Sequence, residues 1–329
     1  LYHSRTISDQ DIAISGMVAA PDGQPPAGGF PLITMAHGTL GINRLCAPSI
    51  DPADGSLRDH PFFDMLQPYV DAGYAVAVTD YQGLGTPGVP AYLLGVSEGR
   101  NVLDAARAAR ALPGLRLAEH TLIWGHSQGG HGAAFAGEIA ADYAPDQQIA
   151  GVALLAPGAE LEIMALGMAL VEKPMLGVGF LVMAAYSWSL NYPGAELTQV
   201  LTPAGMATLD TLRTTIGPAT YAPFEAGPPH EFFSPLGLAL HHTWRTIVAE
   251  NVPGKQRTAA PIFVAQGLAD RIIPPMMTRL FVRRLTHIGN SVKFTTYPET
   301  DHLGLMGTAS ADVATWMHQQ LASAAPAAR

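Results

Sequence analysis

The chain has 329 residues, of which 48% are hydrophobic and only 14% are charged, so it is too apolar to be disordered and long enough to bury a large core. Its formal net charge of −9 and the lack of a cluster among its 18 Lys and Arg residues exclude nucleic acid as a partner. The only cysteine, Cys46, cannot form an intramolecular disulfide.

Short runs rich in Val and Ile alternate with Ala-rich helical stretches along most of the chain. This alternation is typical of an α/β fold, with a mostly parallel sheet flanked by helices. The expected strands are residues 12–20, 30–36, 74–79, 121–124, 149–155, 261–266 and 292–297. The expected helices include residues 62–72, 96–112, 128–143 and 310–321.

The alternation stops between residues 158 and 255, where helical segments rich in Met, Leu and Ala take its place. We interpret residues 1–157 and 256–329 as the two parts of one α/β core and residues 158–255 as an inserted helical cap or lid. Its apolar side chains include Met164, Met168, Met175, Phe180, Met183, Tyr186 and Trp188. Ordinary helical core has the same composition, but an insertion that leaves the carboxyl edge of a parallel sheet lies where ligands bind.

No apolar stretch is long enough to predict a transmembrane segment, since residues 163–190 are broken by Glu172, Lys173 and Pro174. The chain begins at Leu1 rather than Met, so we expect a processed or trimmed form from which any export signal is missing. The compartment stays open, with a secreted or periplasmic location favoured.

Residues 125–129, Gly-His-Ser-Gln-Gly, match the pattern Gly-x-Ser-x-Gly between an expected strand and an expected helix. A nucleophilic serine at such a strained turn needs very small residues two positions before and after it. A chain with 34 glycines can carry the bare pattern by chance, so its place in the fold is what predicts Ser127 as a nucleophile. His126 and His131 flank this serine, and we interpret both as structural.

A serine hydroxyl becomes a good nucleophile when an imidazole takes its proton and a carboxylate orients that imidazole. In α/β enzymes with this motif the chain order is Ser, acid, His. Asp270 follows the expected strand 261–266, and His302 follows the expected strand 292–297. If these strands are adjacent and parallel, both side chains lie at the same sheet edge. Asp301 and Glu299 are rival acids, but a residue next to the base rarely turns back to it.

Six other histidines are candidates for the base in principle but do not fit this order and placement. They are His37, His230, His241, His242, His287 and His318. Acyl transfer also needs backbone N–H donors for the developing oxyanion. We expect the N–H of Gln128 to be one donor, and the loops 37–41 and 80–85 compete to supply the second.

Four motifs together resemble the secretory lipase (lipase A-like) family of α/β-hydrolases over about two-thirds of the chain. They are His-Gly-Thr at 37–39, Cys-Ala-Pro-Ser at 46–49, Asp-Tyr-Gln-Gly-Leu-Gly at 80–85 and Gly-His-Ser-Gln-Gly-Gly at 125–130. The resemblance implies an α/β-hydrolase fold, a helical lid over an acyl tunnel, no cofactor, and esterase or lipase activity. It assigns the oxyanion hole to Asp80 and Gln128. Fungal members carry disulfides that this chain cannot form, which indicates a bacterial-type branch.

The sequence thus predicts a carboxylic ester hydrolase that acts through Ser127, His302 and Asp270 and an acyl-enzyme on apolar acyl or aromatic esters. The expected substrate contacts are Gly38, Thr39, Tyr81, Met164, Met168 and Phe180. The hydroxyl of Tyr81 could point at the oxyanion instead, or the ring could simply pack.

Two other functions stay open, an α/β-hydrolase peptidase or amidase and a non-catalytic binding module on the same scaffold. We expect no metal, because His230-Glu231 and His241-His242 do not form a recognised ligand spacing. Besides a small-molecule ester, a lipid interface that meets the cap is a further expected partner, and the oligomeric state is not indicated.

Overall fold

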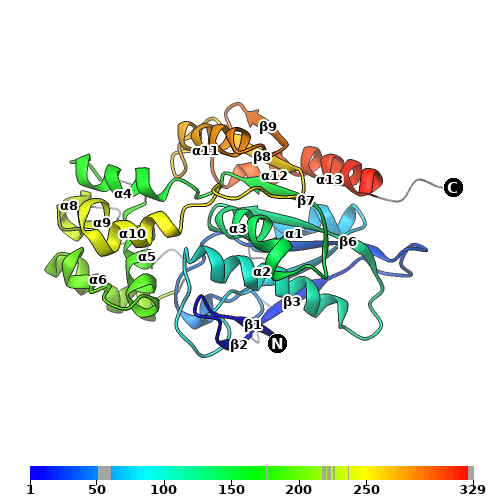
Figure 1. Ribbon diagram of the computed structural model, residues 1–329, viewed down its shortest axis with the longest axis horizontal. Helices are drawn as coiled ribbons and strands as arrows, with labels where there is room; N and C mark the ends of the chain where they lie inside the picture. The colour runs from blue at the N-terminus through cyan, green and yellow to red at the C-terminus, as the bar shows by residue number, and fades with distance from the viewer. Residues whose placement is uncertain are drawn as a thin grey trace.

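The computed structural model describes residues 1–50, 61–174, 177–216, 220, 224, 227–235 and 237–324. These residues form a seven-stranded sheet of order β3-β5-β4-β6-β7-β8-β9 and a separate hairpin of β1 and β2 (Figure 1). In the larger sheet β3 is antiparallel to β5, and the other pairs are parallel. The strands are β1 (Tyr2–Arg5), β2 (Asp11–Ile14), β3 (Gly16–Ala19), β4 (Phe30–Ala36), β5 (Ala75–Thr79), β6 (Leu117–His126), β7 (Gln148–Leu155), β8 (Ile262–Gly267) and β9 (Val292–Tyr297).

The expected α/β fold is confirmed, and six of the seven expected strands lie within a few residues of β4 to β9. The seventh expectation, one strand over residues 12–20, is wrong because the chain passes from the hairpin to the main sheet at this point. Ser15 stands between β2 and β3, is buried, and donates from its hydroxyl to the carboxylate of Asp80 at 2.5 Å. The hydrogen bond between Ser15 and Asp80 therefore marks the point at which residues 12–20 divide into two strands.

Helices cover both faces of the sheet. The first face carries α2 (Gly95–Arg110), α3 (Gln128–Tyr143) and α11 (Pro275–His287), and the second carries α1 (Pro61–Asp71), α12 (Gly304–Thr308) and α13 (Ser310–Ala324). Side chains of one strand alternate between the two faces. In β7, Val152 and Leu154 pack on the first face, whereas Ala153 and Leu155 pack on the second. Apolar burial on both faces explains why these strands read as continuous hydrophobic runs.

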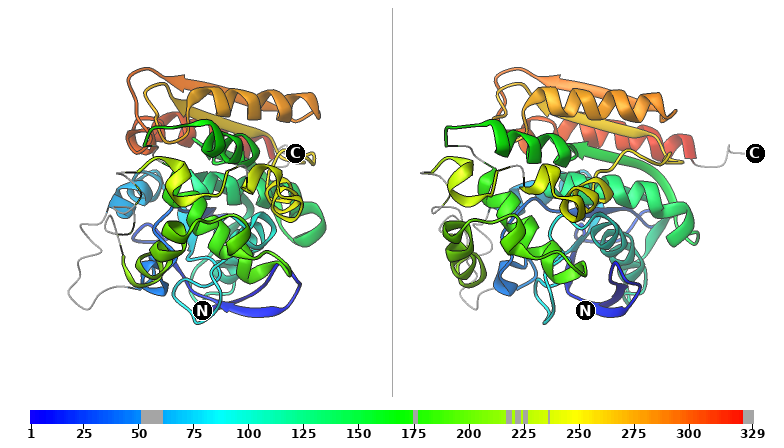
Figure 2. Two further views of the ribbon diagram at one scale, coloured as in Figure 1. Left: turned by 90° about the vertical axis from the view of Figure 1, so that its left-hand side faces the viewer. Right: turned by 60° about the vertical axis from the view of Figure 1, so that its left-hand side comes forward.

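Between β7 and β8 the described residues form helices, apart from one isolated bridge between Leu201 and Phe233. The elements are α4 (Leu161–Leu170), α5 (Val178–Asn191), η3 (Leu197–Gln199), α6 (Pro203–Thr214), α8 (Pro229–Phe232), α9 (Gly237–Leu240) and α10 (His242–Glu250). These green and yellow helices gather at one end of the molecule, and Figure 2 views them from that end. We call the described helices between β7 and β8, with their connections, the helical insertion.

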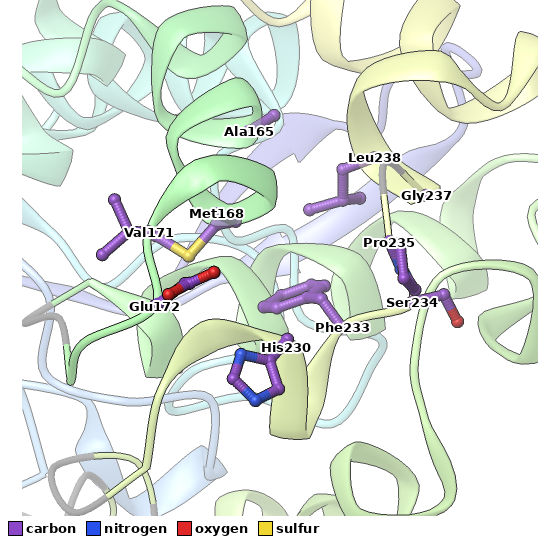
Figure 3. A pocket seen from close by; sticks show the side chains of 10 residues that line it. All are labelled: Ala165, Met168, Val171, Glu172, His230, Phe233, Ser234, Pro235, Gly237 and Leu238. Atoms are coloured by element: carbon purple, nitrogen blue, oxygen red, sulfur yellow. The ribbon is translucent and has the colours of Figure 1, made fainter.

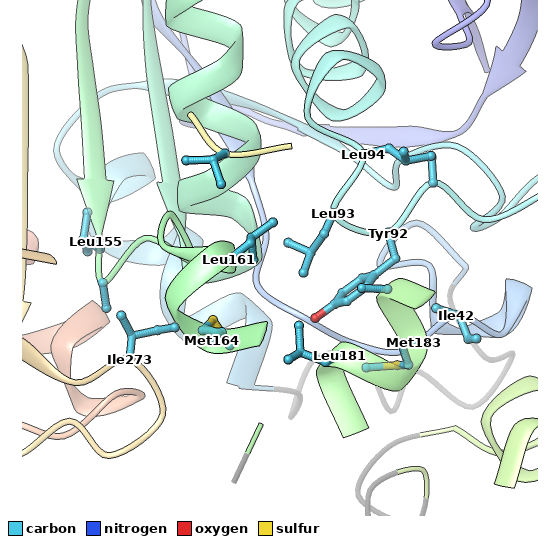
Figure 4. Close-up of a cluster of buried hydrophobic side chains, with 14 of the residues drawn as sticks. Ile42, Tyr92, Leu93, Leu94, Leu155, Leu161, Met164, Leu181, Met183 and Ile273 are labelled. Carbon is cyan, nitrogen blue, oxygen red and sulfur yellow. The ribbon is translucent and has the colours of Figure 1, made fainter. Parts of the chain in front are cut away.

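The helical insertion packs over the carboxyl ends of the strands through an apolar cluster (Figure 4). Leu161 and Met164 of α4 and Leu181 of α5 meet Leu155 at the end of β7 and Ile273 in the loop after β8. All five side chains are at most 5% exposed. The insertion is therefore joined to the edge of the sheet where the predicted site residues lie. No helix among the described residues is both long and apolar enough to cross a bilayer.

Candidate active site

Ser127 occupies a sharp turn between β6 and α3. Its backbone has φ 57° and ψ −118°, a left-handed conformation that a residue with a side chain rarely adopts. Its N–H donates to Leu155 O at 3.0 Å, and its carbonyl accepts from the N–H groups of His131 at 3.1 Å and Gly158 at 3.0 Å. The serine is thus fixed between the end of β7, the first turn of α3 and the start of the helical insertion.

Two glycines allow this turn to form, as expected from the motif. A Cβ on Gly125 would lie 2.0 Å from the carbonyl oxygen of Gly129, and a Cβ on Gly129 would lie 1.8 Å from the carbonyl oxygen of Ala36. Both separations are far inside van der Waals contact, and the clashing atoms belong to the backbone, which cannot rotate away. The helix that follows Ser127 therefore packs directly against the end of β4.

Asp270 and His302 form a hydrogen-bonded pair at the ends of the adjacent parallel strands β8 and β9. His302 Nδ1 donates to Asp270 Oδ2 at 2.7 Å, and the two residues are 5% and 4% exposed. The other carboxylate oxygen accepts from the N–H groups of Ile272 and Ile273, each at 2.9 Å. Burial alone would raise the pKa of Asp270, but the hydrogen bond from His302, the charge of that ring and the two N–H groups outweigh it and lower the pKa.

The rival acids lie elsewhere. Asp301 is exposed, and its Oδ1 accepts from the N–H of Gly304 at 2.8 Å. Glu299 is also exposed, in a turn with φ 55°. Of the three candidate carboxylates, Asp270 is the one bonded to the His302 ring.

His126 connects the serine turn to the histidine. Its Nε2 donates to the backbone carbonyl of His302 at 2.9 Å, and the centroids of the two rings are 4.5 Å apart. Burial, followed by the charge on His302, lowers the pKa of His126 to about 3, so this ring stays neutral at physiological pH. The residue before the predicted nucleophile therefore holds the backbone of the predicted base, which is consistent with the structural role expected for His126.

Gly38, in the loop after β4, lies beside the serine turn because β4 is the direct neighbour of β6. The Cβ position of Gly38 is 3.6 Å from Ser127 Cβ and 3.2 Å from His126 Nδ1. Tyr81 fixes this loop through two contacts with His37. Its buried hydroxyl donates to His37 O at 2.9 Å, and the centroids of the two rings are 4.5 Å apart. The Tyr81 hydroxyl is thus bonded to the protein rather than directed at a substrate.

The prediction that the Asp80 N–H serves as an oxyanion donor is wrong. That N–H donates to Ser15 O at 3.0 Å, as the continuation of the pairing between β3 and β5. The Asp80 side chain is completely buried and accepts from the hydroxyls of Ser15 and Ser49 and, at 2.9 Å, from the N–H of Ser49. Asp80 therefore anchors the segment around Ser49, and β4 stands between its strand and β6.

The other predicted substrate contacts lie on the loop after β4 and in the helical insertion. Thr39 shares a hydrogen bond with the hydroxyl of Tyr92 at 2.8 Å. Met164 is 5% exposed in the apolar cluster of Figure 4, and Phe180 packs against the same cluster. Met168 lines a pocket of about 230 Å³ between α4, α8 and α9 (Figure 3). Met175 lies outside the described residues.

The pocket of Figure 3 has an apolar wall and a polar rim. Its apolar lining includes Met168, Phe233 and Leu238, and its polar lining includes His230 and Glu172. Ser127, Asp270 and His302 are not among the residues that line it. Within the described part of the chain, His, Cys, Asp and Glu side chains nowhere gather in a group of three or more that could hold a metal ion.

Sequence reasoning missed a buried carboxylate below the serine turn. Glu98 of α2 is completely buried and accepts from Gln128 Nε2 at 2.8 Å, from the N–H of Leu93 at 2.9 Å and from His131 Nδ1 at 2.6 Å. The sequence offers little signal for it, because Glu98 stands among the polar residues Ser97, Arg100 and Asn101 in the first turns of α2. Gln128, the predicted oxyanion donor, is thus held by its side chain as well as by its place in α3.

Comparison with known proteins places this geometry in a family. A profile described as Secretory lipase matches residues 63–328. The chain belongs to the secretory lipase family. The resemblance expected from the motifs is therefore confirmed over most of the chain.

Two curated relatives are similar to this member of the secretory lipase family. A secreted triacylglycerol lipase of Malassezia furfur, LIP4, is 27% identical over 310 residues, which are 88% of this chain but 56% of that protein. A probable inactive lipase of Mycobacterium tuberculosis is 30% identical over 172 residues, or 49% of this chain and 36% of that protein. The chain thus spans little more than half the length of one curated relative and about a third of the other.

The fold is that of solved lipases. Candida antarctica lipase A in its closed state superposes with a TM-score of 0.81 at 20% identity, covering 99% of this chain and 78% of that one. At this identity the likeness describes the fold, so the activity has to be argued from the site itself.

Proposed function

We propose that this secretory lipase family member hydrolyses carboxylic esters through Ser127, His302 and Asp270. Ser127 attacks the ester carbonyl while His302 takes its proton, and Asp270 holds the imidazole in the tautomer that accepts at Nε2. His302 then returns the proton to the leaving alcohol, and water hydrolyses the acyl-enzyme by the same steps in reverse order.

The observation that carries this proposal is the joint placement of the strained Ser127 turn and the hydrogen-bonded pair of Asp270 and His302. Ser127 follows β6, and the pair follows β8 and β9 in the same parallel sheet. His126 supports the connection, because it precedes the serine directly and contacts both the ring and the backbone of His302. A serine that only filled a glycine-rich turn would not require its neighbour His126 to hold a buried histidine that is itself bonded to a carboxylate.

For the oxyanion we propose the N–H of Gln128, together with the loop at Gly38 and Thr39 in place of Asp80. Gln128 is the first residue of α3, where N–H groups have no partner inside the helix. A Cβ on Gly38 would lie in ordinary contact with Ser127 Cβ, at 3.6 Å, but would press on His126 Nδ1, at 3.2 Å. Each donor aimed at the oxyanion is typically worth about 3 kcal/mol in the transition state.

The direct test is kinetic. Wild-type protein is expected to hydrolyse p-nitrophenyl butyrate, and Ser127→Ala is expected to lose nearly all of that activity. Ser310→Ala is a matched control, since that hydroxyl only bonds Gly307 O at the start of α13. If Ser127→Ala kept its rate while folding normally, the proposed nucleophile would be wrong.

We propose that residues 158–255 act as a cap whose apolar side chains bind the acyl or aromatic part of the ester. Support comes from Met164 in the cluster above the strand ends and from Met168 in the pocket of Figure 3. In a series of p-nitrophenyl esters of increasing chain length, Met168→Trp should shift the preference toward short acyl chains. Met276→Trp is the control because Met276 is 70% exposed. An unchanged profile for Met168→Trp would remove the pocket from the acyl site.

The same fold supports amide hydrolysis, so an ester and its matching anilide have to be compared side by side. We expect the ester to be cleaved far faster, because Met164 and the apolar cluster around it suit an acyl chain. Preferential cleavage of the anilide would favour a peptidase or amidase. A fold without catalytic function would fail to react with a fluorophosphonate probe.

We further propose that the outer face of α4 contacts lipid and that the protein is secreted or periplasmic. Ile163, Leu166 and Leu170 share one helical face and are 37%, 46% and 70% exposed. The family and the secreted relative support export. The variant Leu166→Ser with Leu170→Ser should lose activity on emulsified triacylglycerol and keep it on a soluble ester. Equal losses on both substrates would contradict the lipid contact.

A further inference from the structure

A buried polar network below the serine turn is not used by the proposed catalytic cycle. It consists of Glu98 on α2, Gln128 and His131 in the first turns of α3, and Asn251 at the end of α10. The side chains of Glu98 and His131 are completely buried. Charged groups are seldom buried so deeply unless they are paired. The hydrogen-bond partners of Glu98 and His131 therefore indicate which of the two carries the proton.

Both ring nitrogens of His131 face oxygen atoms, and both of these oxygens act as acceptors when Glu98 is ionised. Nδ1 is 2.6 Å from the carboxylate of Glu98, and Nε2 is 2.8 Å from the backbone carbonyl of Asn251. A neutral imidazole has a single N–H and can serve one of these acceptors. An imidazolium donates to both, which leaves Glu98 as a carboxylate that also accepts from Gln128 Nε2 and the N–H of Leu93. In that state all of these hydrogen bonds are satisfied.

This carboxylate is bonded directly to the residue whose N–H we assign to the oxyanion. Without a counter-charge, Glu98 would repel the negative charge that develops on the substrate oxygen, and low-polarity surroundings would strengthen the repulsion. The imidazolium on the next turn of α3 cancels that charge. The carboxylate can then hold the Gln128 side chain in place without raising the barrier to acyl transfer.

We propose that Glu98 and His131 form a buried ion pair that positions Gln128 and keeps the oxyanion site electrostatically neutral. Both are positioning residues, since neither is assigned a contact with substrate. The proposal rests on the proposed ester hydrolysis for its kinetic consequence but not for its charge state, so the two are tested by separate measurements.

The same pair ties the helical insertion to the serine turn. Asn251, whose carbonyl accepts from His131, also accepts from the N–H of Gly95 at 2.8 Å and donates to the hydroxyl of Tyr192 at 3.0 Å. Trp188 of α5 donates to Leu93 O at 3.1 Å, next to the N–H that Glu98 holds. The return connection of the insertion, the start of α2 and the first turns of α3 are thus joined through Asn251, His131 and Glu98.

The charge state can be measured directly in the wild-type protein by nitrogen-15 NMR of the histidine rings. The expected result is that both ring nitrogens of His131, assigned by loss of their signals in His131→Gln, carry protons at the pH of the assay. The ring of the exposed His318, assigned through His318→Gln, provides a solvent-facing reference in the same spectra. A His131 ring with one N–H would overturn the ion pair and place the proton on Glu98.

The kinetic consequence is tested by charge compensation. His131→Gln leaves Glu98 without a counter-charge and should lower kcat about tenfold to a hundredfold with little change in KM, less than the loss of about 10²–10³ for removing an oxyanion donor. Adding Glu98→Gln to this variant removes the remaining charge, so kcat of the double variant should be at least about tenfold higher than kcat of His131→Gln alone. A purely structural role predicts the opposite, since a second buried substitution would lower kcat or stability further.

The outcomes separate this proposal from the proposed function. If wild-type protein cleaves no ester and reacts with no fluorophosphonate, ester hydrolysis fails, while the NMR measurement still decides the ion pair. If His131→Gln does not fold, Glu98→Gln alone is measured, and its kcat should fall less than the loss expected for His131→Gln, because its amide can donate to a neutral His131 and still accept from Gln128. A large loss of kcat in folded Glu98→Gln would contradict the claim that a neutral pair at these two positions can replace the ion pair.

Discussion

His126 makes the stability of this protein depend on pH in a way that can be calculated from the structure. Burial lowers the pKa of His126 from its ordinary 6.5 to about 3, so the folded state favours the neutral ring. A lowered pKa gives stability that is complete above the unfolded value and is lost as the pH falls toward the folded value. Between about pH 7.5 and about pH 4.5, this one residue should remove about 3 kcal/mol from the free energy of unfolding.

The comparison that isolates His126 is urea unfolding of wild type and His126→Gln across this pH range. The amide of the variant can still donate to His302 O but cannot take up a proton. Other carboxylates titrate in both proteins, so the difference between the two unfolding free energies should change by about 3 kcal/mol in favour of the variant as the pH falls. Parallel curves would refute the reasoning, because they would mean that His126 keeps an ordinary pKa in the fold.

Three further substitutions test the geometry of the site. Gly129→Ala places a Cβ against the backbone at the end of β4 and should cost more than about 2 kcal/mol of stability and most activity, whereas Gly307→Ala has open space and should be harmless in the same denaturation and ester assays. Tyr81→Phe removes the hydrogen bond to His37 O and should lower the free energy of unfolding in urea by about 1–3 kcal/mol. Its kcat should also fall, and an unchanged kcat would contradict the role of Tyr81 in fixing this loop. Asp270→Asn should lower kcat by about 10⁴ with the fold intact, and a loss below about tenfold would show that it does not orient the base.

The strand-end positions of Ser127, Asp270 and His302 could be predicted because local patterns determine them. Small glycines mark the turn after β6, and alternating strands and helices give the order of the sheet elements along the chain. Adjacent parallel pairing of β8 and β9 followed from the spacing between them, and it brings Asp270 to His302. These features depend on neighbouring residues in the sequence and on general rules of chain connection.

The oxyanion loop could not be predicted, because it depends on which strand lies next to β6. The loops at Gly38 and Asp80 both follow buried strands, and the sequence does not reveal that β4 stands between β5 and β6. The network around Glu98 was missed for a related reason. Its members lie on three separate segments, with Glu98 on α2, Gln128 and His131 on α3 and Asn251 after α10, and only tertiary packing brings them together.

The central claim is that Ser127 is an activated nucleophile rather than a turn residue. The most direct measurement is the mass of the protein and of its peptides after reaction with a fluorophosphonate. We expect a single adduct on the peptide that contains Ser127, complete loss of ester hydrolysis, and no adduct in Ser127→Ala. An unmodified wild-type protein, or an adduct on a different serine, would contradict the account.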